Sequence, residues 1–152
     1  MSKSGYKSIK RILVGMDASE DALNALQLAV KISKADKSEL ILFHVKELPV
    51  GLDSNGEIQV ESGEEEEEET RRIGKALEDA AQFAKKAGTP ARKVVSEHKK
   101  SVGQTIADYA QAQDVSLIVV GSRGMGAIKR KLVGSVANEL AQHALCSVLL
   151  VR

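Results

Sequence analysis

The sequence predicts an α/β protein in which an open parallel sheet of five strands carries helices on both faces. Short, continuously apolar runs recur along the chain and alternate with longer segments whose apolar residues have helical spacing. Strand–helix–strand units cross over with a right hand, which places the strands parallel and covers both faces of the sheet. With 152 residues the chain suits one core, so we expect residues 1–152 to form a single domain.

The first half of the chain contains two buried-strand patterns. Ile12–Val14 is short and apolar, and Ser19 then stands where a helix running to about residue 35 needs an N-cap. Leu40–Val45 predicts the second strand. The segment from Lys46 to Gly63 is rich in turn-forming residues and predicts a long loop.

Six consecutive glutamates, Glu64–Glu69, have two interpretations. They resemble a cation-binding tail, but they also stand at the start of a helical pattern, where acidic side chains favour the helix dipole. We favour the exposed helix start, with Ser62 and Glu65 as a capping box and the helix ending near Gly88. The spacing also predicts two ion pairs, Glu67 with Arg71 and Glu68 with Arg72.

The second half of the chain supplies three more strands. The strand predicted within Ala91–Glu97 is shorter and more polar than the others, which suits an edge of the sheet. Ser101 begins the next helix, which ends before Val115. Leu117–Val120 predicts a strand buried on both faces. The chain closes with a helix over 135–145 and a strand at Ser147–Val151.

A glycine-rich stretch follows the fourth strand and indicates an anion site. Gly121, Gly124 and Gly126 permit turns that expose backbone N–H groups, and Gly134-Ser135 opens the last helix at the positive end of its dipole. Between Val120 and Gly134 the charged residues are four cations and no acid: Arg123, Lys129, Arg130 and Lys131. Such a stretch suits a polyphosphate, although an ordinary glycine turn beside a solvated basic loop is the simpler alternative.

Composition narrows the function classes. The formal net charge is +1 and aromatic residues make up 3%, which gives little support to nucleic-acid binding. No apolar run approaches a membrane span and the first residues are polar, so we expect a cytoplasmic protein without a membrane partner. The one cysteine, Cys146, suits a small buried residue better than a nucleophile.

Catalytic signatures are weak. No nucleophile–base pair is evident, and His44, His98 and His143 lack metal-ligand spacing, so we assign no catalytic residue. Neither a P-loop nor a dinucleotide fingerprint is present. Slow hydrolysis of a bound nucleotide stays an alternative, because bound Mg²⁺ and cationic side chains alone can stabilise the charge on a leaving phosphate.

The glycine spacing Gly121-x2-Gly124-x9-Gly134-Ser135 resembles the ATP-binding motif of the universal stress protein family. Lys10–Glu20 resembles the opening strand of this family with its aspartate. Leu40–Val45 and Cys146–Val151 are similar to its second and last strands. The resemblance runs from about Ser8 to Arg152, nearly the whole chain.

The resemblance implies a Rossmann-like fold, of the adenine nucleotide alpha hydrolase type, with strand order 3-2-1-4-5. It further implies an ATP-binding stress-response regulator that uses Mg²⁺ or Mn²⁺ and forms a homodimer through the strand at Val148–Val151. The positions that the resemblance assigns to the nucleotide are Gly15, Met16, Asp17, Val45, Gly121, Arg123, Gly124, Gly134, Ser135 and Val136.

Several alternatives stay open. Asp17 could hold Mg²⁺ or ribose hydroxyls, or it could cap the following helix. The ligand could be AMP or cyclic AMP, since either would still use Gly121 and Ser135. An ATP-hydrolysing or nucleotidyl-transferring enzyme of the same fold is also conceivable, but Val14–Ser19 lacks the first serine and second glycine of an S-G-G-x-D-S loop.

Overall fold

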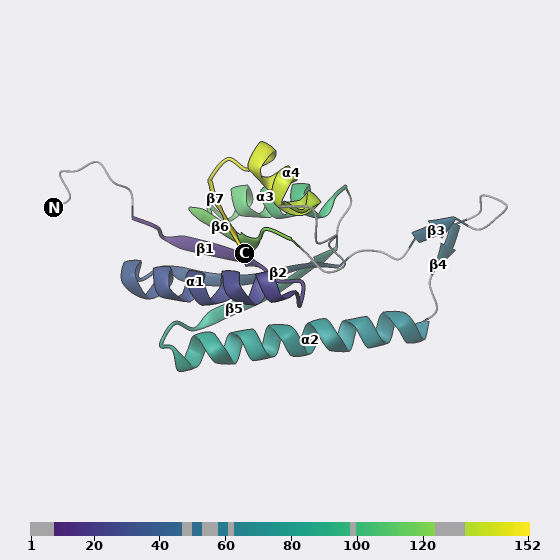
Figure 1. Cartoon of the computed structure of the whole chain (residues 1–152), viewed down its shortest axis with the longest axis horizontal. Coiled ribbons are helices and arrows are strands. Elements are labelled where there is room, and N and C mark those ends of the chain that lie inside the picture. Colours follow the sequence, from purple (N-terminus) through teal and green to yellow (C-terminus); the bar gives the residue numbers. More distant parts are fainter. Residues whose placement is uncertain (1–7, 47–49, 53–57, 61–62, 98–99, 124–132) are drawn as a thin grey trace.

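A five-stranded parallel sheet forms the centre of the computed structural model, which describes residues 8–46, 50–52, 58–60, 63–97, 100–123 and 133–152. Across the sheet the strands follow the order β5-β2-β1-β6-β7 (Figure 1). Numbered among themselves, they have the predicted order 3-2-1-4-5, so the predicted fold class is confirmed. Their bounds are β1 (Arg11–Gly15), β2 (Glu39–Lys46), β5 (Ala91–Glu97), β6 (Leu117–Gly121) and β7 (Ser147–Val151).

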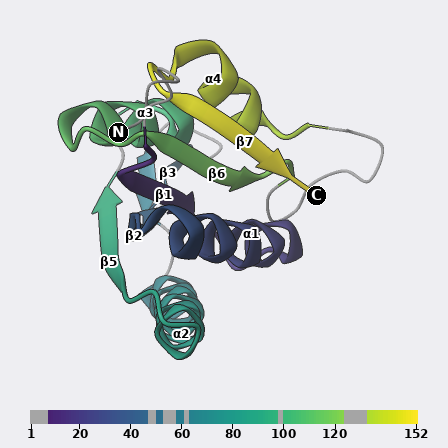
Figure 2. The same cartoon turned by 90° about the vertical axis from the view of Figure 1, so that its left-hand side faces the viewer.

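Helices cover both faces of the sheet (Figure 2). One face carries α1 (Glu20–Asp36) and α2 (Gly63–Lys86), and the other carries α3 (Val102–Ala112) and α4 (Ser135–His143). In β1, Ile12 and Val14 belong to the core cluster beneath α1 and α2, whereas Leu13 belongs to the cluster beneath α3 and α4. Because successive strand residues point to opposite faces, a continuously apolar strand is buried on both sides.

The expected long loop from Lys46 to Gly63 is partly wrong. It contains two short antiparallel strands, β3 (Val50–Leu52) and β4 (Ile58–Val60), which pair with each other and not with the main sheet. The signal was present in the sequence, since each strand alternates apolar with small or polar residues and the dipeptide Asn55-Gly56 is a strong sequence signal for a hairpin. In Figure 1 the hairpin lies beyond the amino-terminal end of α2.

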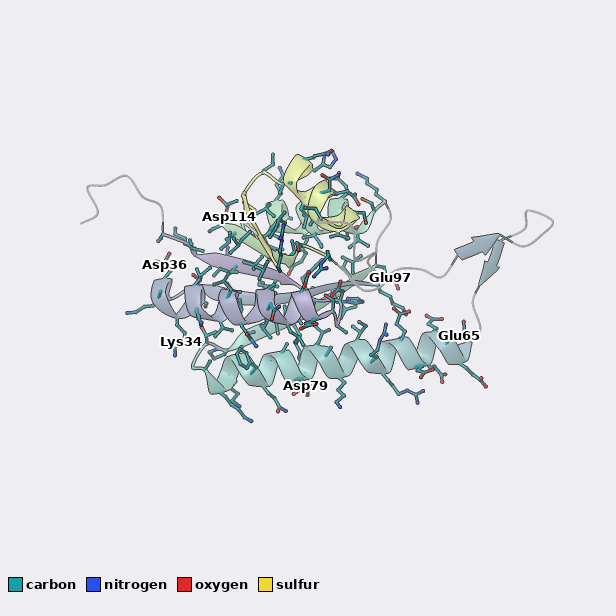
Figure 3. All side chains as sticks on the ribbon, in the orientation of Figure 1. Lys34, Asp36, Glu65, Asp79, Glu97 and Asp114 are labelled. Atoms are coloured by element: carbon teal, nitrogen blue, oxygen red, sulfur yellow. The ribbon has the colours of Figure 1, made fainter. Side chains whose placement is uncertain are left out.

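The glutamate run is the exposed start of α2, as we favoured. The buried residues of α2 all come after this run: Ile73, Leu77, Ala80 and Ala84. Figure 3 shows Glu65 at the amino-terminal end of α2 and Asp79 pointing away from the sheet. Ser62, the expected cap, lies outside the described residues.

The two ion pairs expected within the glutamate run are wrong. Within the described residues, the glutamates of this run pair differently: Glu69 pairs with Arg72 at 3.8 Å, three residues along the helix, and Glu66 pairs with Lys46 of β2 at 2.9 Å. The hydrogen bond that the Lys46 ammonium donates to the Glu66 carboxylate raises the pKa of Lys46. On an exposed helix, a long charged side chain can form several alternative ion pairs of nearly equal free energy, so sequence spacing alone does not select the partner.

The remaining boundaries follow the sequence closely. Ser19 and Ser101 cap α1 and α3 as expected, and Gly88 has a left-handed φ of 86° two residues after α2 ends. The helix expected over 135–145 ends two residues early at His143, because Ala144 adopts the extended backbone that leads into β7. Among the described residues, no helix is long and apolar enough to cross a membrane.

Candidate functional site

The carboxyl ends of β1 and β6 lie side by side. The two strands pair in parallel, with Val14 opposite Val119, and end at Gly15 and Gly121. Both glycines permit close packing, since a Cβ on Gly15 would lie 2.8 Å from Cγ1 of Val120. The predicted crevice residues therefore stand at neighbouring strand ends, where open α/β sheets bind ligands.

Asp17 shapes the turn between β1 and α1. Its Oδ1 accepts a hydrogen bond from the backbone N–H of Ser19 at 3.0 Å, and the Ser19 hydroxyl accepts one from Ala22 at 3.1 Å. Between them, Ala18 has a φ of 63°, a left-handed conformation that is uncommon for a residue with a side chain. Asp17 thus serves the helix entry, while its Oδ2 accepts no hydrogen bond within the described residues.

Met16 and Val45, the expected adenine contacts, point into different cores. Met16 is 3% exposed in the cluster beneath α1 and α2, and Val45 is 5% exposed in the cluster beneath α3 and α4. The backbone of Met16 is held by β2, through its N–H to Phe43 at 2.8 Å and its carbonyl to Nδ1 of His44 at 2.6 Å. The two side chains do not form one apolar slot, so an adenine would meet mainly backbone here.

The end of β6 presses against the first turn of α1. A Cβ on Gly121 would lie 2.7 Å from Cβ of Asp21, 2.9 Å from its carbonyl carbon and 3.0 Å from the nitrogen of Ala22. Real Cβ atoms do not approach other atoms so closely, and two of these atoms are helix backbone. Glycine is therefore required at this position by packing, whether or not a ligand binds.

Asp21 is a site residue that the sequence analysis did not single out. It is buried, and its Oδ2 accepts hydrogen bonds from the Ser122 hydroxyl at 3.3 Å and from Nε of Arg123 at 3.2 Å. An acid in the first turn of a helix is common, so its type and position gave no signal. The contact depends on a close approach of segments that lie 101 residues apart.

The start of α4 is tied to the end of β6. Ser122 donates its N–H to Val151 at 2.7 Å and accepts the N–H of Gly134 at 2.5 Å. This places Gly134 next to the backbone of Ser122, and Ser135 and the half-buried Val136 follow it in the first turn of α4. Unlike α1 and α3, helix α4 receives no side-chain cap within the described residues, because its N-cap residue is Gly134 and not a serine such as Ser19 or Ser101.

Some predicted features lie outside the described residues: Gly124, Gly126, Lys129, Arg130, Lys131 and His98. Of the other histidines, His44 bonds to a carbonyl and His143 lies in the last turn of α4. Cys146 is partly buried, and burial raises the pKa of its thiol, which disfavours the reactive thiolate. Within the described part of the chain, no group of three potential metal ligands occurs.

Comparison with known proteins assigns the fold of this chain to a known class of protein. The solved structure of the universal stress protein UspA from Lactobacillus plantarum superposes with a TM-score of 0.73 at 24% identity, over 97% of this chain and 100% of that one. The chain thus has the open α/β fold of that class. The model of the universal stress protein family matches residues 8–152, and the chain belongs to this family.

Sequence relatives agree with the family assignment. Universal stress protein YxiE of Bacillus subtilis is 33% identical over 147 residues, which cover 93% of this chain and 98% of that protein. Two solved structures of the same fold hold adenine nucleotides. A universal stress protein in complex with cAMP has a TM-score of 0.70 at 23% identity, and a family member from Arabidopsis thaliana with AMP bound has 0.63 at 16%. They cover 96% and 93% of this chain, which in turn spans 98% and 90% of theirs.

Proposed function

We propose that this protein binds ATP with Mg²⁺ where β6 meets α4, and acts as a nucleotide-dependent regulator in the stress response. One observation carries the proposal: α4 begins at Gly134, which offers no side-chain cap, and the N–H of Gly134 is hydrogen-bonded to Ser122, the residue before Arg123. The N–H groups of a helix start and a cationic residue on the adjoining segment together suit a phosphate group. The adenine nucleotides held by two solved structures of the same fold support this ligand class.

The described residues suggest a division of roles. The backbone of Gly121, Gly134, Ser135 and Val136 would surround the phosphates, and Arg123 would supply positive charge. Gly15, Met16 and Val45 would border the adenine from the strand ends. Gly124 belongs to this set by its spacing in the sequence alone, since it lies outside the described residues.

Asp17 fits a role beside a hydrated Mg²⁺. Its Oδ1 is engaged in the turn before α1, whereas Oδ2 accepts no hydrogen bond in the described part of the chain. A single carboxylate together with phosphate oxygens and water is a common way to hold this ion. Bound Mg²⁺ would neutralise phosphate charge, and the ribose hydroxyls are the alternative partners of Asp17.

The ligand can be identified directly. Protein purified without added nucleotide is denatured, and the released small molecules are analysed by mass spectrometry. We expect ATP from the wild type and at least about tenfold less from Arg123→Gln, because a hydrogen bond to a charged group contributes about 1.5–3 kcal/mol. Arg92→Gln is the matched control, since Arg92 is a partly exposed, ion-paired arginine on the opposite edge strand β5.

The other outcomes are equally informative. Release of AMP or cAMP would replace ATP by one of the alternative ligands and keep the site. Absence of any nucleotide, together with an unchanged melting temperature on addition of Mg-ATP, would contradict the proposal. The chain would then be a protein-interaction module of the same fold. Turnover of added ATP by wild-type protein would favour the enzyme alternative, for which we assign no catalytic residue.

We also propose that residues 1–152 act as one cytoplasmic domain that forms a homodimer through β7. This strand is one edge of the sheet, and its residues Ser147–Val151 carry no charge. The other edge, β5, carries Arg92, Lys93 and Glu97, and charged edge strands resist pairing. Main-chain pairing of two β7 edges would bury the apolar side chains of both copies.

Sedimentation equilibrium tests the dimer. We expect the wild type to have twice the chain mass of 16.3 kDa, and Leu150→Lys to sediment as a single chain because it places a charge in the paired strand. Val95→Lys is the control, since Val95 is an exposed apolar residue of the opposite edge strand and should leave the mass unchanged. A wild-type mass of one chain at micromolar concentration would contradict the proposed dimer.

A further inference from the structure

Asp21 is a buried carboxylate that the roles proposed above do not include. It lies in the first turn of α1 and is 8% exposed. A carboxylate removed from water requires hydrogen-bond donors. Its Oδ2 finds two of them, the hydroxyl of Ser122 and Nε of Arg123, on the segment that follows β6.

This contact is not a by-product of helix capping. Ser19 already caps α1 by accepting the N–H of Ala22, so the carboxylate of Asp21 is free of that duty. The missing side chain of Gly121 lets the first turn of α1 approach closely enough for Asp21 to reach Arg123. Ser19 and Gly121 thus allow the Asp21 carboxylate to reach the Arg123 guanidinium.

The guanidinium of Arg123 is only partly used by this contact. Its five N–H donors lie in one plane, and within the described residues only Nε donates a hydrogen bond. The side chain is 38% exposed, and no acceptor among the described residues bonds to its terminal groups Nη1 and Nη2. Two parallel N–H donors fit the oxygens of a phosphate, and their direction is fixed once Nε is held.

Arg123 would keep this contact when an anion binds. If it turned away from Asp21, the buried carboxylate would retain only the hydroxyl of Ser122, and a buried charge without its counter-charge is strongly unfavourable. A phosphate contact made by a partly exposed side chain does not offset that loss. We propose that Asp21 is a positioning residue that holds Arg123 by Nε and leaves its terminal N–H groups for the nucleotide phosphates. This inference rests on the proposed nucleotide binding.

Calorimetric titration with Mg-ATP and with adenosine, which lacks phosphate, tests the inference. We expect Asp21→Ala to weaken Mg-ATP binding by about tenfold and to leave adenosine binding unchanged, because only the phosphate contact depends on Arg123. Asp21→Asn, which restores an acceptor oxygen, should recover part of the loss. In an Arg123→Gln background, Asp21→Ala should have no further effect on Mg-ATP binding, since the two residues act as one unit.

Glu20→Ala is the matched control. Glu20 is exposed in the same turn of α1, so its removal takes away the same charge near the same helix terminus without touching Arg123. Equal losses in Glu20→Ala and Asp21→Ala would overturn the inference in favour of a general charge effect. Wild-type or tighter Mg-ATP binding by both Asp21 variants would also overturn it, while nucleotide binding stood. A wild type that binds neither ligand would overturn both proposals.

Discussion

Replacing Phe43 by alanine is expected to lower the free energy of unfolding by about 3–5 kcal/mol. Phe43 lies in β2, is fully buried, and packs against Tyr109 of α3 with ring centroids 4.4 Å apart. Alanine would remove this contact and leave a cavity that the surrounding β2 and α3 cannot close. Since domains of this size are stabilised by only about 5–15 kcal/mol, the variant would lose a large part of its stability.

Urea unfolding followed by circular dichroism measures this effect. The only other phenylalanine, Phe83, provides the control, because it is 42% exposed on α2. Phe83→Ala should change the free energy of unfolding by about 0.5 kcal/mol or less. Equal unfolding midpoints for the two variants would contradict the assignment of Phe43 to the core between the sheet and α3.

Gly121→Ala is expected to destabilise the protein by about 1–3 kcal/mol, as overpacking does. The new Cβ would lie within 3.0 Å of the backbone of α1, which cannot move aside as a flexible side chain can. Gly74→Ala should have the opposite sign. Gly74 lies in the middle of α2 with no atom near its missing Cβ, and alanine favours an exposed helix by up to about 1 kcal/mol.

Thermal unfolding of both variants gives the comparison. If Gly121→Ala were as stable as the wild type, the close packing of β6 against α1 would be wrong. The prediction also bears on ligand experiments, because a Gly121 variant that loses nucleotide binding would not distinguish a lost phosphate contact from a displaced helix. Arg123→Gln introduces no Cβ against α1, and combining it with Asp21→Ala also avoids a buried carboxylate without its counter-charge.

The main elements of the fold were predictable because their signals are local. A strand such as β6 is apolar at every buried position, and α1 and α3 each begin at a serine that the structure confirms as an N-cap. Side-chain pairing was less predictable. Glu66 pairs with Lys46 of β2, and Arg72 pairs with Glu69 instead of Glu68. Alternative ion pairs between exposed side chains differ little in free energy, so spacing alone does not select one.

Part of the candidate site was likewise predictable from local sequence, and part was not. The glycines and Ser135 were visible from their spacing, and the structure places Gly121 and Gly134 on either side of Ser122. The contact between Asp21 and Arg123 was not visible, because it depends on how α1 packs against the end of β6. The placement of Met16 and Val45 in separate cores was not predicted either, because it follows from the opposite faces of the sheet on which the two side chains lie.

Amide chemical shifts measured during titration with Mg-ATP are the most direct test of nucleotide binding at the junction of β6 and α4. We predict that the largest changes occur at Arg123, Gly134, Ser135 and Val136, where the helix N–H groups lack a side-chain cap. The amides of the opposite edge strand β5 should not move. Unchanged spectra at saturating Mg-ATP, or changes confined to β5 and α2, would contradict the proposed site.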